Sequence, residues 1–273
     1  LMTADMTSAE LAGRIRVHAV ELTHRAHASH VAAALSVADI VAVLYRDVMH
    51  VRPDRPGDPG RDRFVLGKGH AGVAVYAALS ELGFFDRELL YTYYRDGSPL
   101  SGHISHRGVP GVEFSTGSLG HGVAAAAGMA LAGKLNHASW RVYAVTGDGE
   151  CEEGSVWEGA LFAAHQKLDN LTVVVDCNRY QALGTCREQA GMDALAEKWR
   201  QFGFYVTECD GHDHEMLRRQ LQTFRRDMPV CVVAHTVKGK GVSFMENELL
   251  WHYRDPQGEW YERALRELKG DAQ

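Results

Sequence analysis

Residues 140–178, WRVYAVTGDGECEEGSVWEGALFAAHQKLDNLTVVVDCN, decide the fold of this chain. An apolar run at 140–145 leads into a Gly-Asp-Gly turn and an Ala-rich helical pattern, and a second apolar run at 171–175 ends in Asp-Cys-Asn. This order predicts strand, tight turn, helix, strand and turn, with both polar ends at the carboxyl edge of a parallel sheet. Open α/β sheets bind their ligands at that edge.

The polar residues at this edge suit an anion and a hard cation. Gly147 and Gly149 let the backbone approach a bulky anion closely because they have no Cβ. Asp148 offers a carboxylate oxygen, Asn178 an amide oxygen and the region of Tyr180 a main-chain carbonyl, a ligand set that fits Mg²⁺ or Ca²⁺ together with diphosphate oxygens. Gly-Asp-Gly is also a common β-turn sequence. Its position after a buried strand, with an asparagine ending the next strand, favours the binding site.

Length and composition indicate one large α/β domain. The chain has 273 residues, of which 45% are hydrophobic and 23% charged, as in ordinary globular proteins. A formal net charge of −6 without a basic run argues against nucleic-acid binding. The most apolar helical pattern, 123–132, is too short to cross a membrane, and no signal-peptide pattern opens the chain. Five scattered cysteines without a CxxC pair fit a reducing cytoplasm, which is the expected location.

The N-terminal part is expected to be helical. An apolar stripe runs along 11–22, and Ser36 is expected to cap a second helix over 37–48. His30 lies between the two helices. It is either a partly buried residue of a helix–helix turn or a ligand contact.

Two glycine-rich segments follow. In 62–70 a short apolar strand leads into Lys68 and His70, a cation and an imidazole that suit phosphate binding and proton transfer beside the start of a helix. A solvated turn is the alternative. The segment 97–122 has no helical periodicity, and loops this long inside compact domains are usually functional. A small-residue helix is expected from 123 to 134.

The C-terminal part continues the α/β pattern. The expected elements are a helix at 193–201, strands at 205–208 and 230–234, and a charged amphipathic helix at 259–268. The acidic and histidine residues at 210–213 are compatible with a metal site. The preferred prediction is that Asp213 caps a helix starting at Met216.

Residues 147–178 resemble the thiamine-diphosphate signature of transketolases, and other motifs of that family follow in the same order over roughly 12–268. The resemblance implies a thiamine-diphosphate-binding fold, an α/β architecture with a central, mostly parallel sheet and helices on both faces. Five residues depart from the family pattern: Ser29, Ala32, Gly67, Ile104 and Tyr253.

The resemblance also implies the activity and the roles of individual residues. The reaction is transfer of a two-carbon ketol unit from a ketose or ketose phosphate to an aldehyde. Proton transfer and oxyanion contacts are implied for the histidines His30, His70, His103 and His252. Contacts to thiamine diphosphate are implied for Lys68, Gly117, Ser118, Leu119, Gly147, Asp148, Gly149, Glu153, Asn178, Tyr180 and Lys238. The metal, Mg²⁺ or Ca²⁺, is assigned to Asp148, Asn178 and the carbonyl of Tyr180.

The resemblance covers only the family's N-terminal, diphosphate-binding domain, and 1–273 is expected to form this single domain. The pyrimidine-binding and C-terminal domains are expected on a partner chain, in an assembly of two copies of each, and the chain alone is expected to be inactive. Two alternatives are the α subunit of a 2-oxoacid decarboxylating enzyme and a non-catalytic regulatory or scaffolding homologue. The four histidines count against the first alternative, and the Asp148/Asn178 pair counts against the second.

Overall fold

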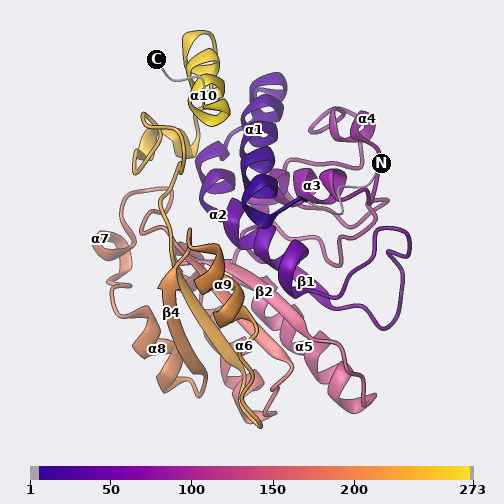
Figure 1. The fold of residues 1–273 in the computed structure, drawn as a ribbon. Helices are drawn as coiled ribbons and strands as arrows, with labels where there is room; N and C mark the ends of the chain where they lie inside the picture. The colour runs from indigo at the N-terminus through magenta and orange to yellow at the C-terminus, as the bar shows by residue number, and fades with distance from the viewer. Residues whose placement is uncertain (1–5, 271–273) are drawn as a thin grey trace.

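A five-stranded, all-parallel sheet forms the centre of the molecule (Figure 1). The computed structural model describes residues 6–270. The strands lie in the order β1 (Arg63–Leu66), β2 (Val142–Gly147), β3 (Leu171–Cys177), β5 (Val230–His235) and β4 (Tyr205–Asp210). The predicted α/β class is therefore confirmed, and all strand pairs are parallel.

Helices cover both faces of the sheet, as expected. Side chains of successive strand residues point to opposite faces, so Val173 and Val175 pack on one side of β3 and Val174 on the other. One face carries α2 (Val31–Val43), α3 (Gly72–Glu81) and α9 (His214–Leu221), with α1 (Ser8–Ala26) packed outside α2. The other carries α5 (His121–Leu135), α6 (Gly154–His165) and α8 (Leu195–Gln201). The shorter or peripheral helices are α4 (Arg87–Leu90), α7 (Cys186–Ala190) and α10 (Glu259–Lys269).

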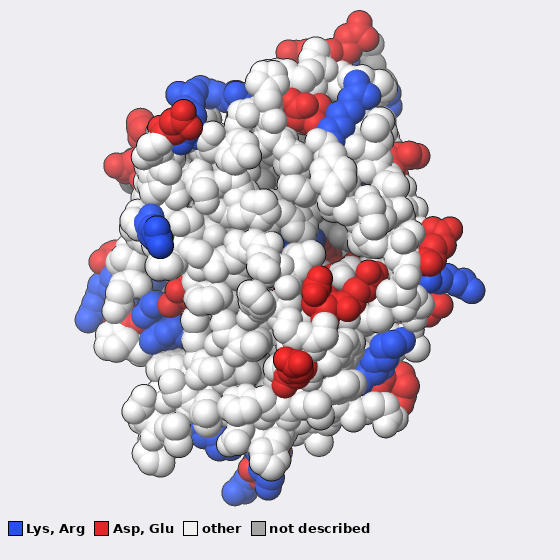
Figure 2. Space-filling view, turned by 180° about the vertical axis from the view of Figure 1, so that it is seen from behind, with Lys and Arg blue, Asp and Glu red and all other residues white. Residues whose placement is uncertain are grey.

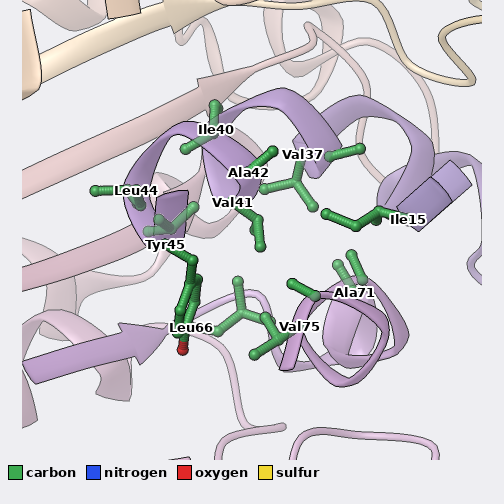
Figure 3. Close-up of a cluster of buried hydrophobic side chains, with 14 of the residues drawn as sticks. Ile15, Val37, Ile40, Val41, Ala42, Leu44, Tyr45, Leu66, Ala71 and Val75 are labelled. Atoms are coloured by element: carbon green, nitrogen blue, oxygen red, sulfur yellow. The ribbon is translucent and has the colours of Figure 1, made fainter. Parts of the chain in front are cut away.

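Helix α2 forms the middle of the larger core (Figure 3). All thirteen of its residues are buried, so it is apolar on every side, as expected for a helix enclosed by other elements. Its Val37 and Val41 lie near Ile15 of α1 and Val75 of α3. Each such fully buried aliphatic side chain contributes roughly 1.5–3 kcal/mol to folding. A polar side chain on this helix must find partners inside the protein.

The prediction that Ser36 caps a helix beginning at 37 is wrong. Helix α2 begins at Val31 and continues past Val43 into a π-helical turn, Leu44–Val48. Ser36 is fully buried within it, and its Oγ donates to the carbonyl of Ala33 (3.1 Å) and to Oδ2 of Asp176 (2.7 Å). A serine before an apolar run has the sequence pattern of a cap, but here a carboxylate distant in sequence satisfies the hydroxyl.

Other boundaries agree with the expectations. Asp213 caps α9 and accepts the N–H of Met216 (2.9 Å), although that helix already begins at His214. Among residues 6–270 no group of three or more His, Cys, Asp and Glu side chains is placed to hold a metal ion, and this includes the segment 210–213. In the same part of the chain no helix is both long enough and apolar enough to cross a membrane.

The strand register brings the functional segments together. Gly147 of β2 pairs with Asp176 of β3, and Cys177 pairs with His235 of β5. These three strands therefore end at the same level of one sheet edge, and the segment after β1 ends beside them. Residues that follow β1, β2, β3 and β5 line one cavity at this edge.

Candidate active site

A cavity of about 320 Å³ lies at the carboxyl edge of the sheet. With the exception of Ser118, every residue that the sequence indicated for catalysis, cofactor or metal lines it: His30, Lys68, His70, His103, Gly117, Leu119, Gly147, Asp148, Gly149, Glu153, Asn178, Tyr180, Lys238 and His252. Ser118 lies on the surface between Gly117 and Leu119 and is exposed. The fold therefore brings together segments that span more than two hundred positions of the sequence.

The four histidines form one cluster at this cavity. The ring centroid of His30 lies 5.0 Å from that of His70, 5.1 Å from that of His252 and 6.0 Å from that of His103. His30 adopts a left-handed backbone conformation (φ 73°) immediately before α2, and its N–H donates to the carbonyl of His252 (2.9 Å). That bond joins two segments of the chain and fixes the two imidazoles relative to each other.

The environment keeps the imidazoles of His30, His70 and His252 neutral. Burial, with the nearby charges of His103, Lys238 and Lys68, lowers the pKa of His30 to about 4. Burial and Lys238 lower the pKa of His252 to about 3. Burial and Lys68 hold the pKa of His70 well below its usual range. At neutral pH these three rings are therefore uncharged and can accept hydrogen bonds from a bound molecule.

Asp148 and Asn178, the predicted metal ligands, both line the cavity. The short 3₁₀ turn Gly149–Glu152 follows Asp148 directly, and α6 begins only at Gly154. Asp148 accepts the N–H groups of Gly149 (2.9 Å) and Arg179. The amide oxygen of Asn178 accepts the N–H of Tyr180 (3.1 Å). The two side chains are therefore already held at the cavity wall by the backbone.

Asp148 is a buried carboxylate. Burial, together with the neighbouring charge of Asp176, raises the pKa of Asp148 to about 6. A divalent cation beside it would offset both effects and keep it ionised. Hard oxygen donors from a carboxylate, an amide and a main-chain carbonyl are the ligands that Mg²⁺ and Ca²⁺ prefer. The residues present therefore fit a cation that bridges to an anionic ligand.

The floor of the cavity contains a buried ion pair that the sequence did not reveal. Nζ of Lys68 lies 2.5 Å from Oδ2 of Asp176, and both side chains are almost inaccessible to solvent. Asp176 also accepts the hydroxyls of Ser36 (2.7 Å) and Thr236. An acidic residue ending an apolar strand was the only signal in the sequence.

Glu150 is a second carboxylate whose role sequence reasoning missed. It lies in the first turn after Asp148, is buried, and accepts the N–H groups of Gly120 (2.9 Å) and Gly147 (3.2 Å). Burial raises its pKa, although these hydrogen bonds counteract the effect. Glu150 thereby ties the loop before α5 to the end of β2.

The far wall carries Lys238, His252 and Tyr253. Nζ of Lys238 lies 2.9 Å from Nδ1 of His252, and the lysine side chain is buried. Burial and the charge of Lys68 lower the pKa of Lys238 to about 8. Tyr253 is 63% exposed and packs edge-on against the rings of His30 and His252. This departure from the family pattern therefore places an aromatic ring at the edge of the histidine cluster.

Comparison with known proteins agrees with this geometry. Residues 7–255 match the family described as transketolase, thiamine diphosphate binding domain. The chain is 41% identical to one of the subunits of apulose-4-phosphate transketolase from Phocaeicola vulgatus, covering 93% of this chain and 90% of that protein. It is 40% identical to the 6-deoxy-6-sulfo-D-fructose transketolase subunit SqwG of a Clostridium species, covering 88% of each.

Solved structures show the same fold. Transketolase from Leishmania mexicana superposes with a TM-score of 0.88 at 28% identity, over 97% of this chain and 41% of that one. Transketolase from Campylobacter jejuni gives 0.88 at 29% identity, over 96% and 42%. This chain thus spans about two fifths of the length of these transketolases. The chain belongs to the transketolase family and matches its thiamine diphosphate binding domain.

Proposed function

We propose that this chain is the diphosphate-binding subunit of a two-chain transketolase, which transfers a two-carbon ketol unit from a ketose to an aldehyde. The observation that carries the proposal is the convergence of the four histidines and the Asp148/Asn178 pair on one cavity. The two relatives described above, both named as transketolase subunits, have nearly the length of the matched region, which supports a subunit role.

Thiamine diphosphate would lie with its diphosphate near Gly147 and Gly149 and with its metal, Mg²⁺ or Ca²⁺, on Asp148, Asn178 and the carbonyl of Tyr180. When bound, the cofactor supplies the electron sink for breaking and forming the carbon–carbon bond. Gly117 and Leu119 line the opposite side of the cavity, where they can contact its uncharged part. Ser118, which is exposed, is the weakest of the predicted contacts.

The histidines would handle the substrate. His30, His70, His103 and His252 are near one another, and the pKa values of His30, His70 and His252 are lowered. A neutral imidazole can take the proton of a sugar hydroxyl or donate to a carbonyl oxygen as the bond rearranges. We expect their contacts to be with substrate oxygens rather than with the diphosphate.

The partner chain would carry the pyrimidine-binding and C-terminal domains, in an assembly of two copies of each. A largely uncharged surface over α5 and α6 is the proposed contact. Its residues are exposed and small or apolar: Ala124, Gly128, Ala132, Leu135, Leu161 and Phe162. Figure 2 shows a face with few lysines and arginines across its middle, and a hollow there has acidic side chains at its rim. Monomeric proteins rarely expose continuous apolar patches of this kind.

The substrate and compartment belong to the same proposal. The two relatives are named for ketoses with a phosphate or a sulfonate group, so we expect a ketose donor with an anionic end. The cytoplasm is the expected location, since the five cysteines are unpaired and four of them are buried.

Reconstitution tests the proposal. The chain and the product of a neighbouring reading frame that encodes the missing domains are purified from a host lacking transketolase. They are mixed at increasing ratios with thiamine diphosphate and Mg²⁺ and assayed with phosphorylated and sulfonated ketoses and short aldehydes. Activity is expected only in the mixture, with a plateau at equal amounts of the two chains. Turnover by the single chain would contradict the split-enzyme proposal, and loss of all activity in an Asp148→Ala mixture is the control for the cofactor.

A further inference from the structure

A buried carboxylate outside the cavity accepts hydrogen bonds from three basic side chains. Asp39 lies in the middle of α2 and is 4% exposed. It accepts hydrogen bonds from the guanidinium of Arg16 in α1, from Nδ1 of His212 (2.6 Å) and from Nε2 of His214 (2.9 Å). Burial alone would raise the pKa of Asp39, but the two histidines and Arg16 together hold it well below its usual range. None of these residues lines the cavity.

The second nitrogen of His212 contacts the chain segment that leads into the site. The backbone N–H of Val237 donates to Nε2 of His212 (2.9 Å). Nε2 must therefore be unprotonated, so Nδ1 carries the proton that Asp39 accepts. Asp39 thus fixes the tautomer and the orientation of the ring, as a carboxylate does for a metal-bound histidine.

Val237 immediately precedes Lys238, whose ammonium lies 2.9 Å from Nδ1 of His252. Two backbone hydrogen bonds anchor the segment 236–241. The N–H of Thr236 donates to the carbonyl of Cys177 (3.1 Å), and the N–H of Gly239 donates to the carbonyl of Ala32 (3.0 Å). Between these two anchors, the N–H of Val237 donates to Nε2 of His212.

We propose that His212 is a positioning residue, held by Asp39, that sets the course of the backbone at Val237 and so keeps the Lys238 ammonium beside His252 at the cavity wall. This inference rests on the proposed function in one respect, namely that Lys238 and His252 belong to the active site. The geometry of the Asp39–His212–Val237 chain stands independently of it.

His214 provides a matched control in the same cluster. It donates to the same carboxylate, but its other nitrogen contacts Oγ of Ser8 (2.9 Å) on α1. Replacing it removes one hydrogen bond to Asp39 without touching the segment 236–241. A purely structural role for the cluster predicts the same consequences for both histidines. A positioning role predicts an effect on the site from His212 alone.

The experiment compares His212→Phe, His212→Gln and His214→Phe with the wild type, for the chain alone and for the complex with its partner. The first readout is hydrogen exchange of the amides at 236–241. Exchange is expected to accelerate at least about tenfold in His212→Phe, because the Val237 amide loses its acceptor. In His214→Phe it should stay near the wild-type rate. The Gln variant retains an acceptor and should restore most of the protection.

The second readout is kinetic. His212→Phe is expected to lower kcat at least about tenfold with a smaller change in KM for the donor, while His214→Phe retains kcat. Equal exchange rates at 236–241 in His212→Phe and wild type would overturn the proposal. Equal effects of the two Phe variants on exchange and kcat would also overturn it. If His212→Phe does not fold, the Gln variant decides: partial loss of protection confined to 236–241 supports positioning, and uniform loss over the whole chain contradicts it.

The outcomes separate the two proposals. If the wild-type complex shows no ketol transfer but the exchange pattern is as expected, the proposed function fails and the positioning role of His212 stands. If the complex is active and exchange at 236–241 does not depend on His212, the positioning role fails and the proposed function is untouched.

Discussion

A Cβ placed on Gly67 would lie 2.6 Å from Oε1 and 2.8 Å from Oε2 of Glu150. Both distances are shorter than any ordinary contact of this kind. The carboxylate cannot move away freely, because the N–H groups of Gly120 and Gly147 hold it in a buried position. The glycine that departs from the family pattern is thus matched to the position of a buried carboxylate beside the proposed metal site.

Gly67→Ala is therefore expected to destabilise the protein by about 1–3 kcal/mol, the cost of leaving buried backbone donors without an acceptor. The measurement is urea unfolding of wild type, Gly67→Ala, Glu150→Ala and the double variant. In the Glu150→Ala background the alanine at 67 should cost little, because its obstacle is gone. Additive effects of the two substitutions would show that the contact does not restrict Gly67.

Asp148→Ala is expected to abolish metal-dependent binding of thiamine diphosphate. The ion would lose its only carboxylate among the proposed ligands Asp148, Asn178 and Tyr180, and a single charged ligand contributes much of the affinity of such sites. Calorimetry on the complex with its partner, with and without Mg²⁺, measures the effect. Asp54→Ala, which removes an exposed carboxylate before β1, is the control. Unchanged cofactor affinity in Asp148→Ala would mean that the metal site is assigned to the wrong residue.

The sheet and most of the site could be predicted from the sequence because their signals are local. Apolar runs that end in glycine and polar residues identify buried parallel strands, and each run delivers its polar residues to the same edge. The histidines are assigned to one site by the resemblance of their segments to transketolase motifs, because no local pattern connects them. The structure confirms that His30, His70, His103 and His252 share one cavity. Their catalytic roles stay predictions.

The parts that could not be predicted depend on partners distant in sequence. Ser36 has the pattern of a helix cap, but it lies inside α2 because the carboxylate of Asp176 satisfies its hydroxyl from 140 positions away. The buried carboxylates of Asp176 and Glu150 are likewise satisfied by donors that other segments of the chain supply. No periodicity encodes such a match, so only the folded structure reveals it.

His103→Ala is expected to lower kcat at least about tenfold while the affinity for thiamine diphosphate changes little, since its proposed partners are substrate oxygens. The ring of His103 lies near Gly117 and His30, and within residues 6–270 it forms no hydrogen bond with Lys68 or Lys238. His252→Ala should also lower kcat, but it removes the acceptor of Lys238 and is expected to weaken the cofactor site as well. Steady-state kinetics and calorimetry on both variants separate the two effects. Parallel losses of affinity and rate in His103→Ala would instead assign that residue to the cofactor site.

Acid should destabilise the free chain through His30. Its pKa is lowered to about 4 in the folded protein, so between the usual value near 6.5 and that value the unfolded chain binds more protons. The free energy of unfolding therefore falls as the pH falls through this window. The loss at pH 5 is at most about 2 kcal/mol, and partial exposure of the side chain reduces it further. Urea unfolding near pH 7.5 and pH 5 measures the loss. The difference should be smaller in His30→Asn, which carries no titrating ring, and an identical loss in the two proteins would contradict the assignment.

Leu161→Glu is expected to prevent assembly without unfolding the chain. Leu161 is 58% exposed on α6. Gly159, two residues earlier in that helix, lets α5 approach closely, because a Cβ there would lie 3.0 Å from the backbone nitrogen of Ala124. The two helices thus present one joined surface, and a carboxylate buried in its contact would cost several kcal/mol. The measurement is sedimentation of the mixture with the partner chain, together with circular dichroism of the variant. Phe224→Glu, 56% exposed beyond α9, is the control that should assemble normally. Normal assembly of Leu161→Glu with full activity would place the partner on another face of the molecule.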